Sequence, residues 1–499
     1  MRRFSGRKRF IFSFLFLSFL ITLASVSPAL AGQAVKALKQ LDDRYKTDIL
    51  LVVAHPDDEG AATPYLARAI DEGKRVAVVF GTRGSSGANE VGAEQAAALG
   101  AVREIEARRA LRTLGIENVW FLDGKDTASQ NVLQSLSNWN HGAALQQLVR
   151  LMRLTRPEVV LTFLPGTFIG EDHGDHQAAG VLATEAFDLS GDPAAFAEQL
   201  AGPTKRLEPL LDNLRPWQPK KLYYFADADK EDIFRGLGPE YSVKDVAKSS
   251  KRAYWRTAME EYLVHETQAK SFADTLKGMN DAQIEELITT EGYWDDALRF
   301  VLGKSLVGGT VTGDIFENIT PDPIAFQPPH GLQESGGMKS AEAAQGSNKA
   351  TGDIKQLTSR DLSMELAGPW TFYAHFRQEH GLTHLPHPEP PEIALQVGTT
   401  LVIPLWVTNR TATTQEFAVS VDLPAGWTIQ SGAGKFTIGA KQTDAARIEV
   451  NLPAAVSATT DAAKKNPEMQ EITLRAESNG RSIGVVKLRV ELRKRALPQ

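Results

Sequence analysis

Residues 48–59, DILLVVAHPDDE, decide how the first part of this chain folds. The run from Asp48 to Val53 is almost wholly aliphatic, which is typical of a strand that is buried on both faces of a parallel sheet. A histidine, a proline and two adjacent aspartates follow at once. In open parallel sheets, ligands bind beyond the carboxyl ends of the strands. The stretch therefore predicts a buried strand with a polar site at its end.

The pattern continues outward from this strand as an α/β alternation. Further strands are expected at 75–80, 118–122, 159–163 and 221–225, and helices at 61–72, 92–114, 143–155 and 246–276. Strands separated by helices of this length predict right-handed crossovers. The first domain, expected over 32–320, is thus a Rossmann-like, mostly parallel sheet flanked by helices.

The last part of the chain has a different pattern. Short β-rich runs occur at 401–407, 417–423, 446–452, 471–476 and 483–492, and they predict an all-β sandwich over 392–499. We expect Trp406 and Trp427 to serve its core rather than to stack on sugar rings. Residues 321–391 are expected to be a linker or an irregular connecting region, because 334–352 is rich in Gly, Ser, Gln and Ala. A histidine cluster in this region is expected to be solvated: His375, His380, His384 and His387.

The first residues predict export. Five basic side chains precede the apolar run 10–26, and small residues at 28–32 form a cleavage site, so residues 1–31 are expected to be a signal peptide cut after Ala31. The mature protein would be periplasmic or extracellular, with no transmembrane segment. Cleavage removes five positive charges, so the net charge falls from −6 to −11, and no basic patch suggests nucleic acid. The chain has no cysteine, so any metal must be held by His and carboxylates.

A second polar segment, EDHGDH at 171–176, follows the strand expected at 159–163. Zinc in hydrolases takes three protein ligands and leaves a fourth position for water, and His55, Asp58 and His176 would supply such a set. Asp57 is then free to accept a proton from that water. Either segment alone could be an ordinary turn. Together, at two strand ends, they predict a Zn²⁺ site.

AHPDDE followed by HGDH resembles the PIG-L-type (LmbE-like) deacetylases, over about residues 48–268. GTRG at 81–84, Arg103 to Glu106 and HETQ at 265–268 add to the resemblance. It implies that His55, Asp58 and His176 are the metal ligands and that Asp57 is the general base. It also implies that His173 steadies the charged tetrahedral intermediate, although the family usually has HPDH at 173–176.

Two arginines are expected near the substrate. Arg83 and Arg103 could each contact it, and Arg103 could instead pair with Glu104 or Glu106. The resemblance implies an exported, zinc-dependent hydrolase of the N-acetyl amide of N-acetylglucosamine-type sugars or glycoconjugates. Two alternatives stay open: a zinc amidase acting on another amide, and a non-catalytic, metal-containing carbohydrate-binding protein. PAGW at 424–427 makes the C-terminal region similar to Ig-like modules appended to secreted glycosidases.

Overall fold

The computed structural model describes residues 43–127, 130–166, 173–200, 214–226, 234–291, 294, 297–328, 361–385, 387, 389–454 and 469–493. The expected signal peptide and the Gly/Ser-rich stretch 334–352 lie outside these residues. No helix of the described part is both long and apolar enough to cross a membrane.

The first part of the chain is a helix-flanked sheet. Its strands are β1 (Ile49–Val53), β2 (Val76–Phe80), β3 (Val119–Phe121), β4 (Val159–Phe163), β5 (Lys221–Phe225) and β8 (Val301–Ser305), in the order β3-β2-β1-β4-β5-β8. Its helices include α3 (Thr63–Asp71), α4 (Ala97–Thr113), α5 (Val132–Asn138), α6 (His141–Thr155), α7 (Gly174–Leu189), α8 (Tyr254–Tyr262), α9 (Glu266–Leu276) and α10 (Asp281–Glu286). Strands β6 (Glu240–Ser242) and β7 (Ala297–Arg299) form a separate two-stranded antiparallel sheet.

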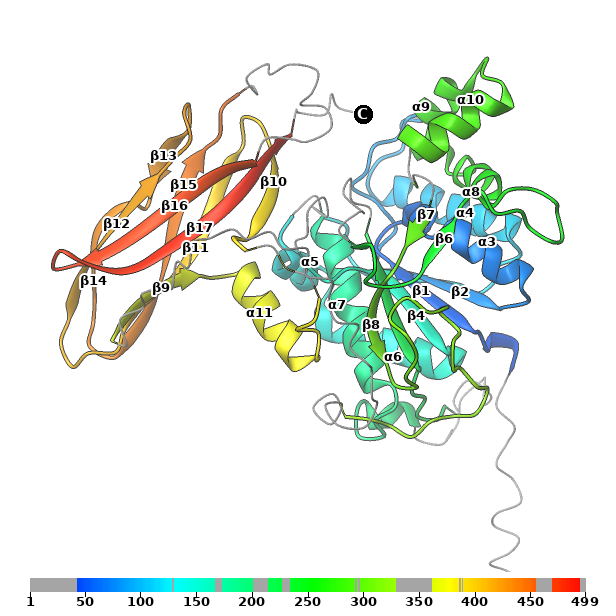
Figure 1. Ribbon diagram of the computed structural model, residues 1–499, viewed down its shortest axis with the longest axis horizontal. Coiled ribbons are helices and arrows are strands. Elements are labelled where there is room, and N and C mark those ends of the chain that lie inside the picture. The colour runs from blue at the N-terminus through cyan, green and yellow to red at the C-terminus, as the bar shows by residue number, and fades with distance from the viewer. Residues whose placement is uncertain are drawn as a thin grey trace, which may run out of the picture.

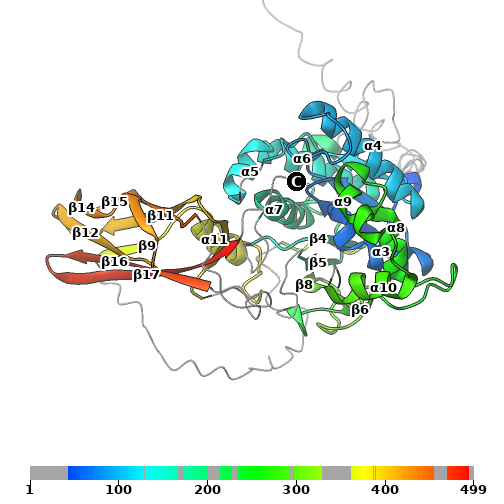
Figure 2. The ribbon, with the colours of Figure 1, turned by 90° about the horizontal axis from the view of Figure 1, so that it is seen from above.

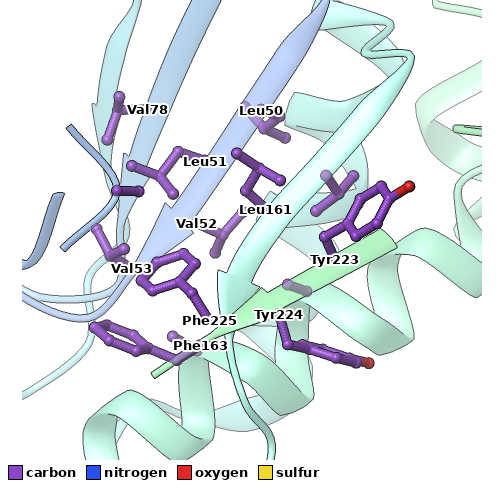
Figure 3. Close-up of a cluster of buried hydrophobic side chains, with 14 of the residues drawn as sticks. Leu50, Leu51, Val52, Val53, Val78, Leu161, Phe163, Tyr223, Tyr224 and Phe225 are labelled. Atoms are coloured by element: carbon purple, nitrogen blue, oxygen red, sulfur yellow. The ribbon is translucent and has the colours of Figure 1, made fainter. Parts of the chain in front are cut away.

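The predicted sheet is confirmed, and its parallel strands fall within one or two residues of their expected bounds. Five strands are parallel and the edge strand β8 is antiparallel to β5. All five residues of β1, β2, β4 and β5 are buried, as expected for strands covered by helices on both faces. Figure 3 shows the aliphatic side chains of β1 packed beside Phe163 and the aromatic residues of β5.

Some helices differ from the prediction. The helix expected at 92–114 begins only at Ala97, because Ala96 has a positive φ of 51°. The single helix expected at 246–276 is two helices, α8 and α9, and the break at 263–265 carries His265. Helix α7, which was not predicted, directly follows the second polar segment. These differences matter because His265 and α7 both contribute to the site.

The C-terminal part is a two-sheet β structure, as predicted. One sheet has the order β10-β17-β16-β12-β14 and the other β13-β15-β11-β9. Their strands are β9 (Leu362–Leu366), β10 (Glu392–Gln396), β11 (Thr400–Asn409), β12 (Gln415–Asp422), β13 (Thr428–Ser431), β14 (Gly434–Ile438), β15 (Gln442–Asn451), β16 (Met469–Ser478) and β17 (Arg481–Arg493). Trp427 is buried in its core, whereas Trp406 is 36% exposed. Figures 1 and 2 show this sandwich beside the α/β part, with α11 (Pro369–Glu379) between them.

The expectation of an irregular region over 321–391 is wrong for its second half. Strand β9 pairs with β11, so the sandwich begins about thirty residues before 392. Helix α11 packs on α7, and Tyr373 and Phe376 belong to the same buried cluster as the α/β sheet. The apolar side chains of α11 pack against the α/β part, and the local composition of residues 321–391 does not indicate such a distant contact.

The histidine cluster is solvated in part, as expected, but two of its members also contact the α/β part. His380 Nδ1 lies 2.7 Å from Asp188 Oδ2 at the end of α7, and His384 Nε2 lies 3.0 Å from the carbonyl oxygen of Leu302 in β8. His380 is half-buried, whereas His375, His384 and His387 are exposed. Two of these histidines therefore tie α11 and the chain after it to the α/β part.

Candidate functional site

The strand order places the two polar segments beside each other. From β1 the chain crosses to β2 on one side, while β4 pairs with β1 on the other side. The strand order thus reverses between β1 and β4, which is where doubly wound sheets bind ligands. His55 follows β1, and His176 lies in the first turn of α7, which follows β4.

The three predicted metal ligands come together. His55 Nδ1 lies 3.4 Å from Asp58 Oδ2, and His176 Nε2 lies 3.2 Å from Asp58 Oδ1. The backbone N–H groups of Ala54 and His55 donate to Asp58 Oδ2 at 3.0 and 2.7 Å, so this carboxylate is held in place. The His176 ring is stacked on Phe163, with centroids 4.3 Å apart.

This donor set fits a divalent zinc-type ion. Tetrahedral ligands about 2.1 Å from a zinc ion lie roughly 3.4 Å from one another, close to the two distances above. Burial raises the pKa of Asp58, but His176 and His55 outweigh it and hold that pKa well below its usual value. A charged carboxylate flanked by two imidazoles is the environment that a cation needs. His55, His173 and His176 also bring their ring nitrogens within 4.8 Å of one another.

Two further carboxylates, which the sequence analysis did not single out, lie behind His55. Its Nε2 is 3.2 Å from Asp126 Oδ1 and 3.3 Å from Asp175 Oδ2. Asp175 is fully buried and also accepts the backbone N–H of Thr127 at 3.0 Å. Burial raises the pKa of Asp126, but its hydrogen bond to His55 outweighs this and lowers the pKa to about 2.

These carboxylates orient His55. Because Nε2 faces these two carboxylates, Nδ1 is the nitrogen that faces Asp58. In metal sites, a carboxylate on one ring nitrogen of a histidine commonly directs the other nitrogen at the metal in this way. The sequence held one signal for each of these two carboxylates. Asp126 follows the third expected strand, and Asp175 lies between His173 and His176.

Asp57 has an unusual backbone conformation. Its φ is 101°, in a region where residues with a side chain are strained. Its backbone N–H donates to Glu59 Oε2 at 2.8 Å, and its Oδ1 accepts from Arg103 Nη2 at 2.7 Å. Burial raises the pKa of Asp57, Arg103 opposes this, and the negative charge of Asp58 adds to the rise. The net effect is a carboxylate whose pKa lies above the ordinary value.

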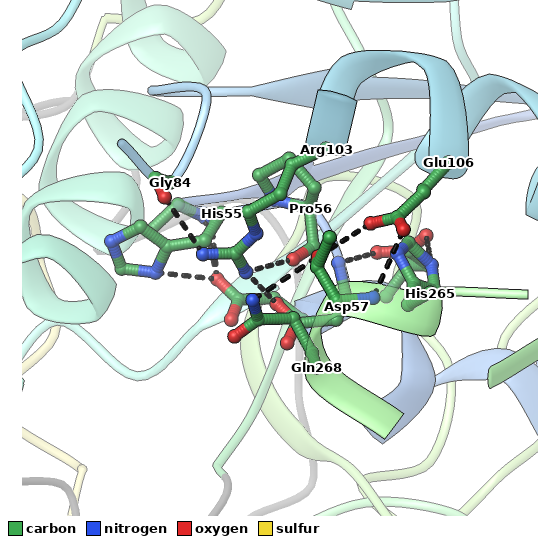
Figure 4. Close-up of polar contacts among 12 residues, drawn as sticks. His55, Pro56, Asp57, Gly84, Arg103, Glu106, His265 and Gln268 are labelled. Carbon is green, nitrogen blue, oxygen red and sulfur yellow. Dashed lines mark hydrogen bonds and ion pairs between the residues drawn. The ribbon is translucent and has the colours of Figure 1, made fainter. Parts of the chain in front are cut away.

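Arg103 lies at the site, as one of its two expected roles requires, and the other role, a pair with a neighbouring glutamate, is wrong. It does not pair with Glu104 or Glu106; besides Asp57, it donates to the carbonyl oxygens of Pro56 at 2.5 Å and Gly84 at 2.9 Å (Figure 4). Gly84 has a φ of 64°, and a Cβ there would lie 2.3 Å from Arg103 Nη1, so a side chain at 84 would displace the guanidinium. The buried Arg103 thus braces the turn that carries Asp57.

Arg83 points to the surface of α4. Its Nε donates to Glu104 Oε2 at 2.7 Å, and its Nη1 lies 3.6 Å from Asp123 Oδ1. It is absent from the described residues that line the cavity at the site. The structure therefore gives Arg83 a pairing role at the rim.

Glu59 and the late HETQ segment meet in a buried cluster. His265 Nε2 lies 2.9 Å from Glu59 Oε1 and 3.8 Å from Glu261 Oε1, and all three side chains are fully buried. Next to it, Glu106 accepts from the backbone N–H of Thr267 at 2.9 Å. His265 and Glu59 are 206 positions apart in sequence, and Thr267 and Glu106 are 161 apart. Figure 4 shows Glu106 and His265 on the opposite side of Asp57 from His55. This cluster could bind a cation, but its contact through Glu59 to the Asp57 backbone makes it a support for the site.

His173 completes the histidine group. Its ring centroid lies 4.8 Å from that of His55 and 5.0 Å from that of His176. Burial lowers the pKa of His173 to about 3, and the neighbouring His55 and His176 contribute. The imidazole is therefore neutral at neutral pH, so it can donate one hydrogen bond but carries no positive charge.

A polar cavity opens on these groups. It has a volume of about 730 Å³, part of it open to solvent, and it is lined by His55, Asp57, Asp58, Ser86, Gly87, Arg103, Asp126, His173 and His176. The predicted metal ligands, a carboxylate on a strained backbone and hydrogen-bonding groups thus share one space, which is the arrangement expected of a hydrolytic site.

A family model agrees with this position. The PIG-L model, described as GlcNAc-PI de-N-acetylase, matches residues 50–187. The matched stretch runs from β1 into α7 and contains His55, Asp57, Asp58, His173 and His176.

Known proteins resemble the α/β part. A 1D-myo-inositol 2-acetamido-2-deoxy-alpha-D-glucopyranoside deacetylase of Thermobifida fusca (strain YX) is 27% identical over 280 residues, covering 49% of this chain and 91% of that protein. The Streptomyces griseus enzyme of that name is 35% identical over 164 residues, covering 29% of this chain and 50% of that protein. The solved N,N'-diacetylchitobiose deacetylase from Pyrococcus horikoshii is 17% identical, with a TM-score of 0.36, over 59% of this chain and 96% of that one.

Proposed function

We propose that this protein is a zinc-dependent deacetylase that hydrolyses the N-acetyl amide of N-acetylglucosamine-type sugars or glycoconjugates. One observation carries the proposal. At the switch point between β1 and β4, His55, Asp58 and His176 lie together, and the carboxylate of Asp57 lies beside them but contacts Arg103 instead. The printed names of the relatives, which are deacetylases of a glucosamine-containing substrate, support the choice of substrate.

His55, Asp58 and His176 would hold the metal. When bound, zinc supplies a Lewis acid for the amide carbonyl and lowers the pKa of water at the site. Asp126 and Asp175 fix the orientation of His55, and two backbone N–H groups fix Asp58.

Asp57 would act as the general base and then as the general acid. It takes a proton from the attacking water and passes it to the nitrogen, because an amine leaves an amide only after protonation. Its raised pKa suits both steps, since the same group must accept and then donate. Arg103 positions the carboxylate through Oδ1.

His173 would stabilise the negative charge that develops on the carbonyl oxygen. Since its pKa is lowered to about 3, it acts as a neutral N–H donor rather than as an imidazolium. Ser86 and Asp126 line the same cavity and offer hydrogen-bonding groups to sugar hydroxyls. We assign no substrate contact to Arg83.

Export and the C-terminal module remain part of the proposal. The charged and apolar residues before Ala31 support a cleaved signal peptide, and the PAGW segment in a two-sheet sandwich supports an Ig-like module. N-terminal sequencing of the protein from its own cells would begin at Gly32 if cleavage occurs where we propose.

The test is acetate release from N-acetylglucosamine glycosides. We expect activity that a chelator abolishes and added zinc restores. Asp57→Asn should keep its metal but lose roughly 10²–10⁴-fold in kcat, because the amide cannot accept the proton. Asp58→Ala should lose metal affinity, and excess zinc should restore part of its rate.

The exposed Asp123 beside the same strand ends provides a matched control, and Asp123→Asn should change neither property. If both Asp57→Asn and Asp58→Ala retain full rate, this is not the active site. Metal and sugar binding without acetate release would favour the non-catalytic alternative, and release of another amine would favour a different amide.

A further inference from the structure

A second cavity adjoins the polar one at the reacting groups. It has a volume of about 520 Å³, part of it open to solvent, and is lined by Asp57, Asp58, Gly60, Ala61, Met259, Tyr262, Phe272, Ile288 and Trp294. Asp57 and Asp58 line both cavities, and no other lining residue is shared. The two spaces therefore meet at Asp58 and Asp57, the proposed ligand and base.

Apart from the two aspartates and the hydroxyl of Tyr262, the side chains that line this second cavity are mainly apolar. Met259, Ile288 and Trp294 are all at least nine-tenths buried. The indole N–H of Trp294 donates to the carbonyl oxygen of Gly60 at 3.1 Å, so the rest of its ring offers apolar surface. Tyr262 and Phe272 meet edge to face, with centroids 5.8 Å apart. We call this space, with the nine lining residues above, the aromatic cavity.

The amide of an N-acylated sugar joins a polar sugar on its amine side to an apolar acyl group on its carbonyl side. The two cavities differ in polarity in the same way. The polar cavity offers Ser86 and Asp126, which suit the hydroxyl groups of a sugar on the amine side. The aromatic cavity offers carbon surface on the other side of the same aspartates. An acetyl group has a single methyl to place there, whereas the space is far larger than one methyl.

Resting on the function proposed above, we propose that the aromatic cavity is an acyl subsite and that the enzyme hydrolyses N-acylated amino sugars with acyl groups of four or more carbons. Water adds its oxygen to the acyl carbon, and the C–N bond breaks. The products are a carboxylate and a free amino sugar, and the water proton taken by Asp57 ends on the amine. No co-reactant other than water is needed.

The size of the effect follows from apolar burial. Each methylene removed from water should raise kcat/KM by about fourfold. A hexanoyl group adds four methylenes to acetyl, so we expect a preference on the order of 10–100-fold when burial is incomplete.

The experiment compares N-acetyl-, N-butanoyl-, N-hexanoyl- and N-octanoyl-glucosamine by release of the amine, using the full chain with zinc. The expected result is a kcat/KM that rises with acyl length. A parallel arm compares methyl and octyl N-acetylglucosaminides, which place the apolar chain on the amine side. A gain confined to octyl glycosides would overturn the proposal, because the cavity would then hold an aglycone.

Phe272→Ala removes one aromatic wall from a half-buried position on α9 and should lower the hexanoyl-to-acetyl ratio of kcat/KM severalfold. Leu276→Ala, one turn further along the same helix and outside the cavity, should leave that ratio unchanged. Hydrolysis of acetyl alone would overturn the acyl subsite and leave the proposed deacetylase intact. No hydrolysis of any N-acyl sugar would overturn the proposed function itself.

Discussion

At the scale of single residues, the contact between Arg103 and Asp57 governs the chemistry that we propose. Arg103 lies on α4, 46 residues from Asp57, and its neighbours Glu104 and Glu106 are bound to Arg83 and Thr267. Arg103 is therefore paired with neither glutamate, and its guanidinium donates to Asp57, the proposed base. Burial raises the pKa of Asp57 and Arg103 lowers it, so the two effects together set the pH at which the base is available.

This balance predicts a shift in pH dependence. Asp57 must be deprotonated to accept a proton, so kcat/KM should fall as the pH drops through its raised pKa. Arg103→Gln removes the charge that opposes the rise, and the acid limb should therefore move to higher pH. Arg103→Lys keeps a positive charge and should place the limb between the two.

The measurement is kcat/KM for acetate release from pH 4 to 9, with metal content determined in parallel. Arg83→Gln is the control, because Arg83 pairs with Glu104 and Asp123 at the rim. An acid limb that stays in place in Arg103→Gln would mean that Arg103 does not set the pKa of Asp57.

At the scale of elements, helix α7 joins the site to the rest of the molecule. Its first turn carries His176 and its last turn carries Asp188. Asp188 contacts Lys304 of β8 at 2.5 and 2.6 Å and His380 beyond α11 at 2.7 Å. Burial lowers the pKa of Lys304, and the charge of Asp188 opposes this.

We expect Asp188→Ala to be strongly destabilising. It would leave the buried Lys304 without its counter-charge, which typically costs about 3–5 kcal/mol. Urea unfolding followed by circular dichroism measures the change. Asp274→Ala on α9 is the control, since Asp274 pairs with two lysines at the exposed surface, and exposed pairs contribute little. Equal unfolding midpoints for the two variants would show that the buried group is not needed.

At the scale of the whole molecule, α11 makes the second part of the chain a structural partner of the first. Tyr373 donates a hydrogen bond to Gln177, the residue after His176, and Phe376, Leu382 and Leu385 lie in the core of the α/β part. In Figures 1 and 2, α11 lies against the α/β part while the sandwich extends away from it.

A pair of truncations tests this arrangement. A chain ending at 391 keeps α11, whereas one ending at 328 exposes the face of α7 that α11 covers. We expect the shorter chain to be less stable by several kcal/mol, because burying a single large apolar side chain contributes about 1.5–3 kcal/mol. Thermal unfolding and zinc content of both fragments give the answer. Equal Tm values would place α11 outside the folding unit of the α/β part.

The sequence by itself determined the parallel strands and the site at their ends. Burial on both faces leaves a local pattern, a mainly aliphatic run of about five residues, and β1 and β2 show it clearly. His55, Asp58 and His176 could be predicted to meet because the carboxyl ends of neighbouring parallel strands share one edge of the sheet.

Only the tertiary structure decided which charges are partners and where the remaining segments pack. Arg103 binds Asp57 and not the adjacent glutamates. His265 contacts Glu59, which is 206 residues away in sequence. Helix α11 packs against the α/β part, although the sequence predicted a linker there. Local periodicity records whether a side chain is buried. It does not record against what, because that depends on distant segments that meet only when the chain has folded.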